Sequence, residues 1–246
     1  MVKIQEIQIG ALIIGSLYWH DSELRSEWRR EHLRLEAKQL VKAPIRYGRR
    51  SKGWGMSYTM VFSMNLVSEN LYGRAIFVPY NKPVYNFEDL VRRAKQLWAA
   101  ESNNEHSTHI SARNGWGRVA LLENQNHPMP YEFRTNWAKY VAAEVGYSKI
   151  DTAVGEEKVV DKSGFLRIPW PKFNSSSDLK ANALLTAVTN PTTNKNRQYP
   201  SSKEIADAWK NSDDEQHVDY FRKNRLHGIE TFQDIEIQDE LQDLLK

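Results

Sequence analysis

An apolar segment near the start of the chain constrains the fold more than any other stretch. Ile7-Gln8-Ile9-Gly10-Ala11-Leu12-Ile13-Ile14 runs into Gly15-Ser16-Leu17-Tyr18-Trp19, and a charged stretch begins at His20. A continuous Ile/Leu run of this length fits a strand covered on both faces better than an amphipathic helix. Gly15 allows backbone conformations closed to other residues, so successive N–H groups could hold an anion there. The alternative is that Gly15 only turns the chain.

Composition limits the kinds of partner that the chain can have. The 246 residues are 40% hydrophobic, enough for one large core or two modest domains. We expect a main domain over residues 1–145 and a C-terminal extension over residues 146–246. The 34 basic and 31 acidic residues nearly balance, with a net charge of +3, so composition permits nucleic acid as a partner but does not indicate it.

The lack of cysteine and of an apolar targeting segment bears on the compartment in which the chain is expected. The absence of cysteine excludes disulfides, thiolate metal sites and a cysteine nucleophile, and it fits a reducing compartment. Polar residues interrupt any signal-peptide core after Met1, and no segment approaches the roughly 20 apolar residues of a membrane span. We therefore expect a soluble, cytoplasmic protein with no membrane partner.

The clearest helix extends from Asn86 to Glu101. Its apolar residues follow the i, i+3, i+4, i+7 pattern of one helical face, and Asn86 is a good N-cap with Asp89 three residues later. The same period places Glu101 on or beside the apolar face. A partly desolvated carboxylate has a raised pKa and is a better base, whereas a solvated acid at a helix end is the simpler alternative.

The remaining patterns predict a mixed α+β chain. Strand patterns occur at Tyr58–Ser63, Leu71–Pro79 and 115–122, with Gly53 and Gly55 predicting a turn between strands. Helical patterns occur from Ser22 to about Val41, from Phe133 to Val141, and from Leu179 to Val188. Ser201 and Glu204 form a capping box, and the charged remainder of the chain favours helix.

Several well-known site patterns are absent from the sequence. It contains no Walker loop, dinucleotide fingerprint, zinc-protease helix or nucleophile elbow. His106 and His109 are three residues apart, but no further ligand pattern completes a metal site, so we interpret them as loop histidines in solvent. We expect no metal and no cofactor.

Three short motifs together resemble the γ-glutamylcyclotransferase-like superfamily. They are Ile14-Gly15-Ser16-Leu17-Tyr18-Trp19 after the first strand, Tyr47-Gly48-Arg49-Arg50-Ser51, and the strand Gly73-Arg74-Ala75-Ile76-Phe77 with its following helix. The chain is most similar to the branch whose first loop reads Tyr-Gly-Ser-Leu-Ile-Trp. The resemblance covers roughly Ile4 to Leu122. It implies a small mixed β-barrel surrounded by helices, to which we add a largely helical C-terminal extension.

The same resemblance implies a reaction and a set of residues. In this family the α-amino group of a γ-glutamyl compound attacks its own side-chain carbonyl, an intramolecular aminolysis that releases an amine and 5-oxoproline. Carried over here, Gly15, Ser16 and Leu17 supply backbone donors, and Glu101 is the base. The remaining candidates for substrate binding are Tyr18, Arg49 and Ser51.

Two alternatives stay open at this point. Glu88, Glu105 and Glu123 are competing acids for the role of base. The chain could also be a non-catalytic protein that keeps the fold as a module for binding a small molecule or a partner.

Overall fold

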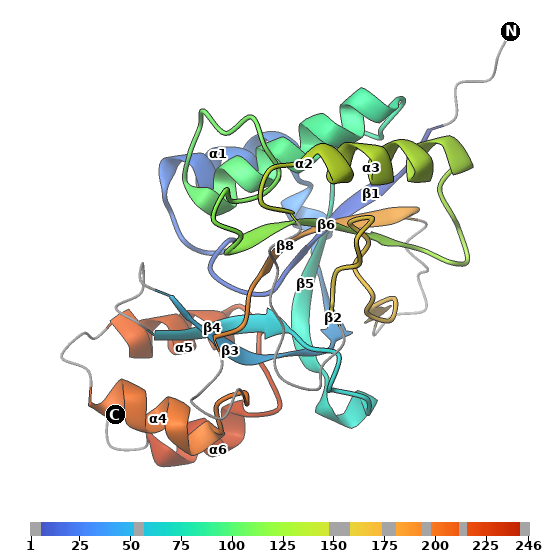
Figure 1. The fold of residues 1–246 in the computed structure, drawn as a ribbon. Coiled ribbons are helices and arrows are strands. Elements are labelled where there is room, and N and C mark those ends of the chain that lie inside the picture. Colours follow the sequence, from blue (N-terminus) through green and yellow to red (C-terminus); the bar gives the residue numbers. More distant parts are fainter. Residues whose placement is uncertain are drawn as a thin grey trace, which may run out of the picture.

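The computed structural model describes residues 6–51, 57–147, 158–173, 181–192, 198–211 and 216–241, and these form an α+β fold (Figure 1). The predicted α+β class is therefore confirmed. The predicted turn at Gly53 and Gly55 lies outside the described residues. The helices are α1 (Glu23–His32), α2 (Phe87–Ser102), α3 (Tyr131–Ala143), α4 (Ser202–Lys210), α5 (Gln216–Leu226) and α6 (Asp234–Glu240). The strands are β1 (Ile9–Ile13), β2 (Gln39–Ala43), β3 (Ile45–Ser51), β4 (Ser57–Phe62), β5 (Gly73–Pro79), β6 (Gly117–Glu123), β7 (Lys172–Phe173) and β8 (Ala183–Thr189).

The main sheet has six strands in the order β6-β8-β1-β5-β2-β7, and β3 pairs with β4 in a separate hairpin. The pair β1 and β8 is parallel, whereas every other neighbouring pair in the main sheet is antiparallel. In the described part of the chain β6 and β7 are the two edges of this sheet, and no closed barrel forms. The mixed sheet is as expected, but the predicted barrel is not confirmed.

The first strand is buried as its sequence predicts. All five residues of β1 are buried, with β5 on one side and β8 on the other. A strand inside a sheet that is covered on both faces needs an apolar side chain at every position, which explains the uninterrupted run.

The helix predicted at Leu179–Val188 is wrong. Residues Ala183–Thr189 form β8, which lies between β1 and β6 in the main sheet. The segment after residue 146 thus contributes a strand to the sheet itself and does not only pack on it. The division of the chain near residue 145 stays a prediction.

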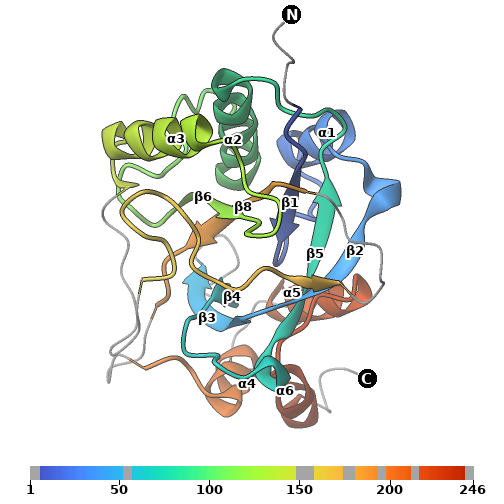
Figure 2. The ribbon, with the colours of Figure 1, turned by 90° about the vertical axis from the view of Figure 1, so that its right-hand side faces the viewer.

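Helices cover the two sides of the sheet in separate groups. Figures 1 and 2 show α1, α2 and α3 on one side, and the β3–β4 hairpin with α4, α5 and α6 on the other. The capping box predicted at Ser201 and Glu204 is present at the start of α4. The helix predicted from Ser22 to about Val41 is shorter than expected, because α1 ends at His32 and the chain then enters β2 at Gln39.

The parallel pair determines where the site can form. Ile9 is in register with Ala183 and Ala11 with Leu185, so both strands run in the same direction and end at the same edge of the sheet. The chain leaves β1 through Gly15 at this edge, beside Ala187 and Thr189 of β8. Ligands of sheets with parallel strands commonly bind beyond the carboxyl ends of such strands.

Candidate functional site

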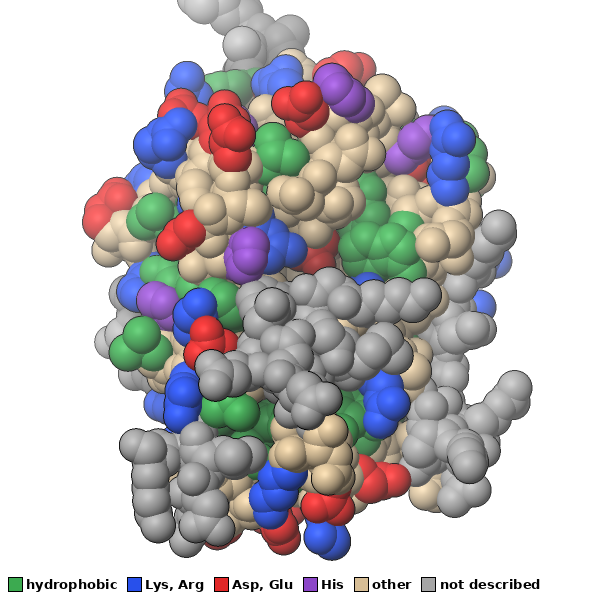
Figure 3. Space-filling view, turned by 90° about the vertical axis from the view of Figure 1, so that its left-hand side faces the viewer, with side chains coloured by type: hydrophobic (Ala, Val, Ile, Leu, Met, Phe, Trp, Pro, Cys, Tyr) green, Lys and Arg blue, Asp and Glu red, His purple; other side chains and the backbone are tan. Residues whose placement is uncertain are grey.

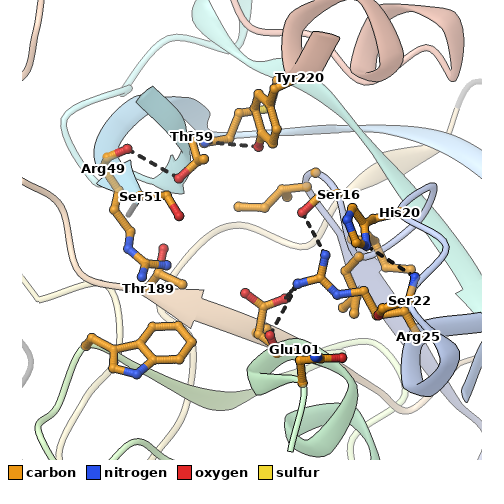
Figure 4. Close-up of a pocket in the computed structure, with 18 of the residues that line it drawn as sticks. Ser16, His20, Ser22, Arg25, Arg49, Ser51, Thr59, Glu101, Thr189 and Tyr220 are labelled. Atoms are coloured by element: carbon orange, nitrogen blue, oxygen red, sulfur yellow. Dashed lines mark hydrogen bonds and ion pairs between the residues drawn. The ribbon is translucent and has the colours of Figure 1, made fainter. Parts of the chain in front are cut away.

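A cavity of about 400 Å³ lies at this edge of the sheet, between the two groups of helices. Its polar and charged lining converges from six parts of the chain: the turn after β1, α1, the β3–β4 hairpin, the end of α2, β8 and α5 (Figure 4). The lining residues are Leu12, Ile13, Ile14, Gly15, Ser16, Leu17, His20, Ser22, Arg25, Arg49, Ser51, Thr59, Met60, Glu101, Asn103, Trp116, Ala187, Thr189 and Tyr220.

The turn after β1 has the form of a single helical turn. Tyr18 N–H donates to the Gly15 carbonyl, and the N–H groups of Trp19 and His20 donate to the Ser16 carbonyl. The N–H groups of Ser16 and Leu17 have no acceptor among the described residues, as expected at the start of a helical turn. Two unpaired backbone donors therefore belong to residues that line the cavity.

Gly15 is required here for space and not for an unusual backbone angle. Its φ is not positive, so the expectation that glycine provides a special conformation is wrong. A Cβ at position 15 would lie 2.6 Å from the hydroxyl oxygen of Tyr220, closer than real Cβ contacts allow. Glycine at position 15 therefore lets the Tyr220 side chain from α5 approach the end of β1.

Glu101 lies in the last turn of α2. The helix begins at the Asn86 cap, whose side chain accepts from Asp89 N–H as predicted, and ends at Asn103, which has a left-handed backbone with φ of 50°. The Glu101 side chain is 17% exposed. Burial raises the pKa of its carboxyl, while the nearby charges of Arg25 and Arg49 act in the opposite direction. The expected desolvated carboxylate is therefore present.

Arg25 joins Glu101 to the turn. Its Nη1 donates to the Ser16 hydroxyl over 3.1 Å, and its Nη2 lies 3.8 Å from a carboxylate oxygen of Glu101. The same guanidinium donates to the main-chain carbonyls of Ala100 and Glu101 at the end of α2. These carbonyls have no partner within the helix, so Arg25 also caps the helix end.

Arg49 enters the cavity from the opposite wall. The pairing of β3 with β4 shifts by one residue between Tyr47 and Arg49, which marks a bulge at Gly48 and sets Arg49 opposite Thr59. The Arg49 guanidinium lies 4.5 Å from the centre of the Trp116 ring. Burial lowers the pKa of Arg49, and Glu101 raises it. The cavity thus combines two arginines with one carboxylate and favours an anionic group in its ligand.

The structure brings most of the predicted site residues together. Gly15, Ser16, Leu17, Arg49, Ser51 and Glu101 all line the same cavity. Tyr18 does not line it: its ring contacts the His227 ring at 5.2 Å between centres, and the amino group of Lys38 lies over it.

The competing acids lie elsewhere. Glu88 and Glu105 are exposed, and Glu105 pairs with His106. Glu123 is buried, but it pairs with Arg134 and accepts from Met129 N–H outside the cavity. Of the four acids considered, Glu101 alone lines the cavity.

Arg25, His20, Thr189 and Tyr220 line the cavity but are not among the residues predicted from the sequence. Arg25 and Arg29 are one turn apart on α1, beside the buried Trp28, and arginines next to a core position are a signal that could have been used. Tyr220 and Thr189 are distant in sequence from every motif, so no local pattern links them to the site.

One of the two loop histidines, His106, is exposed to solvent as interpreted, whereas His109 is only partly exposed. His109 Nδ1 lies 3.4 Å from the Glu144 carboxylate, whose side chain is buried. Both histidines line a second, more open hollow of about 540 Å³ on the other side of Trp116. Within the described ranges, no three His, Cys, Asp or Glu side chains gather as metal ligands would.

The distribution of surface charge and the character of the helices bear on the partners expected for the chain. Acidic and basic side chains are interspersed over the face in Figure 3, without a large coloured patch of one sign. No helix in the described part of the chain has the length and apolar character that crossing a membrane requires.

Comparison with protein-family models, curated proteins and solved structures finds no match for this chain.

Proposed function

We propose that this cavity binds a γ-glutamyl amine or related amide and converts it to 5-oxoproline and a free amine. The observation that carries the proposal is that the Gly15–Leu17 turn and Glu101, 84 or more residues apart in sequence, line one cavity and share Arg25 as a neighbour. An anion site and a desolvated base at one place are what the cyclisation needs.

The unpaired N–H groups of Ser16 and Leu17 would hold the α-carboxylate of the substrate. The ammonium group would then lie toward Glu101, whose carboxylate has a pKa raised by burial and is a stronger base for that reason. Binding the α-carboxylate fixes the folded conformation of the substrate, in which its nitrogen can reach its own side-chain carbonyl.

In the reaction, Glu101 takes a proton from the ammonium group, and the amine nitrogen forms a bond to the side-chain carbonyl carbon. Negative charge develops on the carbonyl oxygen, where the guanidinium of Arg49 would stabilise it and Ser51 would donate a hydrogen bond. The bond from that carbon to the leaving nitrogen then breaks as the carbonyl re-forms and the protonated Glu101 gives its proton to that nitrogen. The regenerated carboxylate takes the second proton from the ring nitrogen and passes it to the released amine, so the products are 5-oxoproline and an ammonium ion. No cofactor takes part in this proposed sequence.

A panel of γ-glutamyl compounds tests the proposal. Purified protein is incubated with γ-glutamyl amines, γ-glutamyl amino acids and free glutamine, and 5-oxoproline is measured by mass spectrometry. We expect catalytic formation of 5-oxoproline from at least one member. Formation of glutamate in place of 5-oxoproline would indicate hydrolysis and would contradict the cyclisation.

One observation favours a second function, the binding of a small anionic molecule without catalysis. The Glu101 carboxylate already faces the guanidinium of Arg25, and an acid held in an ion pair can serve to shape a pocket. In that case the protein would bind a γ-glutamyl compound and leave it intact.

A further inference from the structure

Arg25 contacts two parts of the cavity wall at once. Its guanidinium reaches the Ser16 hydroxyl and the Glu101 carboxylate (Figure 4). It also donates to the main-chain carbonyls of Ala100 and Glu101. Its side chain is only 12% exposed. The turn after β1 and the end of α2 are two of the walls of the cavity. One side chain from α1 therefore connects them.

Arg29, one helical turn further along α1, shows by contrast what is particular to Arg25. Arg29 donates to the carbonyls of Leu17 and His20 and pairs with Asp21. These contacts hold the loop after β1 against α1, and none of them reaches Glu101. Arg25 alone among the two links the loop to the end of α2.

We propose that Arg25 is a positioning residue: its guanidinium fixes the distance and the orientation of Glu101 relative to the Gly15–Leu17 turn. The inference rests on the proposed function, because it assigns Arg25 a part in the cyclisation that Glu101 performs. An arginine suits this part, since its planar guanidinium presents five donors in a fixed arrangement. The ammonium group of a lysine carries the same charge but cannot span acceptors on both walls.

The charge of Arg25 has a separate effect from its geometry. The charged or titratable groups that face Glu101 are Arg25 from α1, Arg49 from β3 and Tyr220 from α5, and His20 lines the same cavity. Burial raises the pKa of Glu101, and Arg25 is the leading group that opposes this rise. Removing its charge should therefore raise the pKa of Glu101 further, so the base would ionise only at higher pH.

Two substitutions separate the two effects. Arg25→Lys keeps the positive charge but loses the simultaneous contact with the Gly15–Leu17 turn and the end of α2. Arg25→Gln loses both the charge and this contact. With the best substrate of the γ-glutamyl panel, we expect kcat to fall on the order of 100-fold in both variants, as misplacement by about 1 Å can cause. The acid limb of the pH–kcat profile should stay near the wild-type position in Arg25→Lys and move to higher pH in Arg25→Gln.

A matched control and a second readout complete the test. Arg30→Gln changes an exposed arginine of the same helix, which pairs with Glu31, and should leave kcat and the profile unchanged. Thermal melting checks that each variant is folded. Titration of the Glu101 carboxyl by NMR, in protein carrying ¹³C-labelled glutamate, should show a higher pKa in Arg25→Gln than in wild type, whether or not the protein turns over substrate.

The outcomes distinguish this inference from the proposed function. If wild type forms 5-oxoproline and Arg25→Lys has wild-type kcat, the positioning role is wrong while the proposed function stands. If wild type forms no 5-oxoproline, the proposed function fails and the catalytic role of Arg25 fails with it. If Glu101 titrates at the same pH in wild type and in Arg25→Gln, the charge of Arg25 does not lower the pKa of Glu101. That part of the inference is then wrong whether or not the protein is active.

Discussion

The contact between Gly15 and Tyr220 joins two parts of the chain that are 205 residues apart in sequence. Gly15 ends the first strand, and the hydroxyl of Tyr220 occupies the space that a Cβ would need. The same hydroxyl accepts a hydrogen bond from Met60 N–H, and burial raises the pKa of Tyr220 to about 12. Tyr220 is therefore a neutral, fixed wall of the cavity at ordinary pH.

Gly15→Ala should displace Tyr220 and lower both stability and turnover. We expect a loss of about 1–3 kcal/mol in the free energy of unfolding, as for other overpacked sites. Adding Tyr220→Phe should recover much of this loss, because the next nearest atom of the ring, Cζ, is 3.6 Å from the position of the new Cβ. Chemical denaturation of the two single variants and the double variant measures the coupling. Additive losses would show that the clash does not explain the glycine.

The sequence predicted individual residues of the site to a limited extent. Glu101 and the turn at Gly15–Leu17 were identified because their local patterns, helical periodicity and a strand ending in glycine, have a direct physical basis. The reason for Gly15 was missed, since the close approach of Tyr220 is a contact between distant segments. The hydrogen bond from Arg25 to the Ser16 hydroxyl and the bulge that orients Arg49 were missed because each depends on how neighbouring elements pack, which no sequence period shows.

At the level of elements, β8 explains why the second half of the chain was misread. Its sequence, Ala183-Leu-Leu-Thr-Ala-Val-Thr189, has no polar alternation and contains good helix formers, so a buried strand and a buried helix cannot be told apart by periodicity. These residues form a strand because they lie between β1 and β6, whose buried backbone N–H and C=O groups need β8 as their hydrogen-bond partner. α2 was predicted well because its amphipathic face and its cap agree.

Removing the C-terminal part of the chain should abolish folding. A fragment of residues 1–145 lacks β8, so β6 loses its neighbour in the sheet and one side of β1 is left unpaired. We expect circular dichroism of this fragment to show no cooperative thermal transition, whereas the full chain melts cooperatively. A cooperative transition in the fragment, with native-like near-ultraviolet signals, would support an independent domain over residues 1–145.

In the molecule as a whole, the cavity depends on the meeting of segments that no local pattern connects. The turn after β1, the bulged hairpin, the last turn of α2, the end of β8 and α5 each contribute to its wall. The parallel pair of β1 and β8 brings two of these segments to one edge, and Arg25 connects a third. We propose that this arrangement makes Glu101 a base and not only a structural acid.

Glu101→Gln distinguishes a base from a structural acid at this position. The substitution keeps the size and a hydrogen-bonding oxygen beside Arg25 but removes the proton acceptor. The measurement is the rate of 5-oxoproline formation by the variant and by wild type, with calorimetric binding of the same γ-glutamyl compound and thermal melting as controls. We expect turnover to fall about 10²- to 10⁴-fold, as for loss of a general base, while binding and the melting transition persist. A variant that binds and turns over the substrate at the wild-type rate would show that Glu101 is not the base.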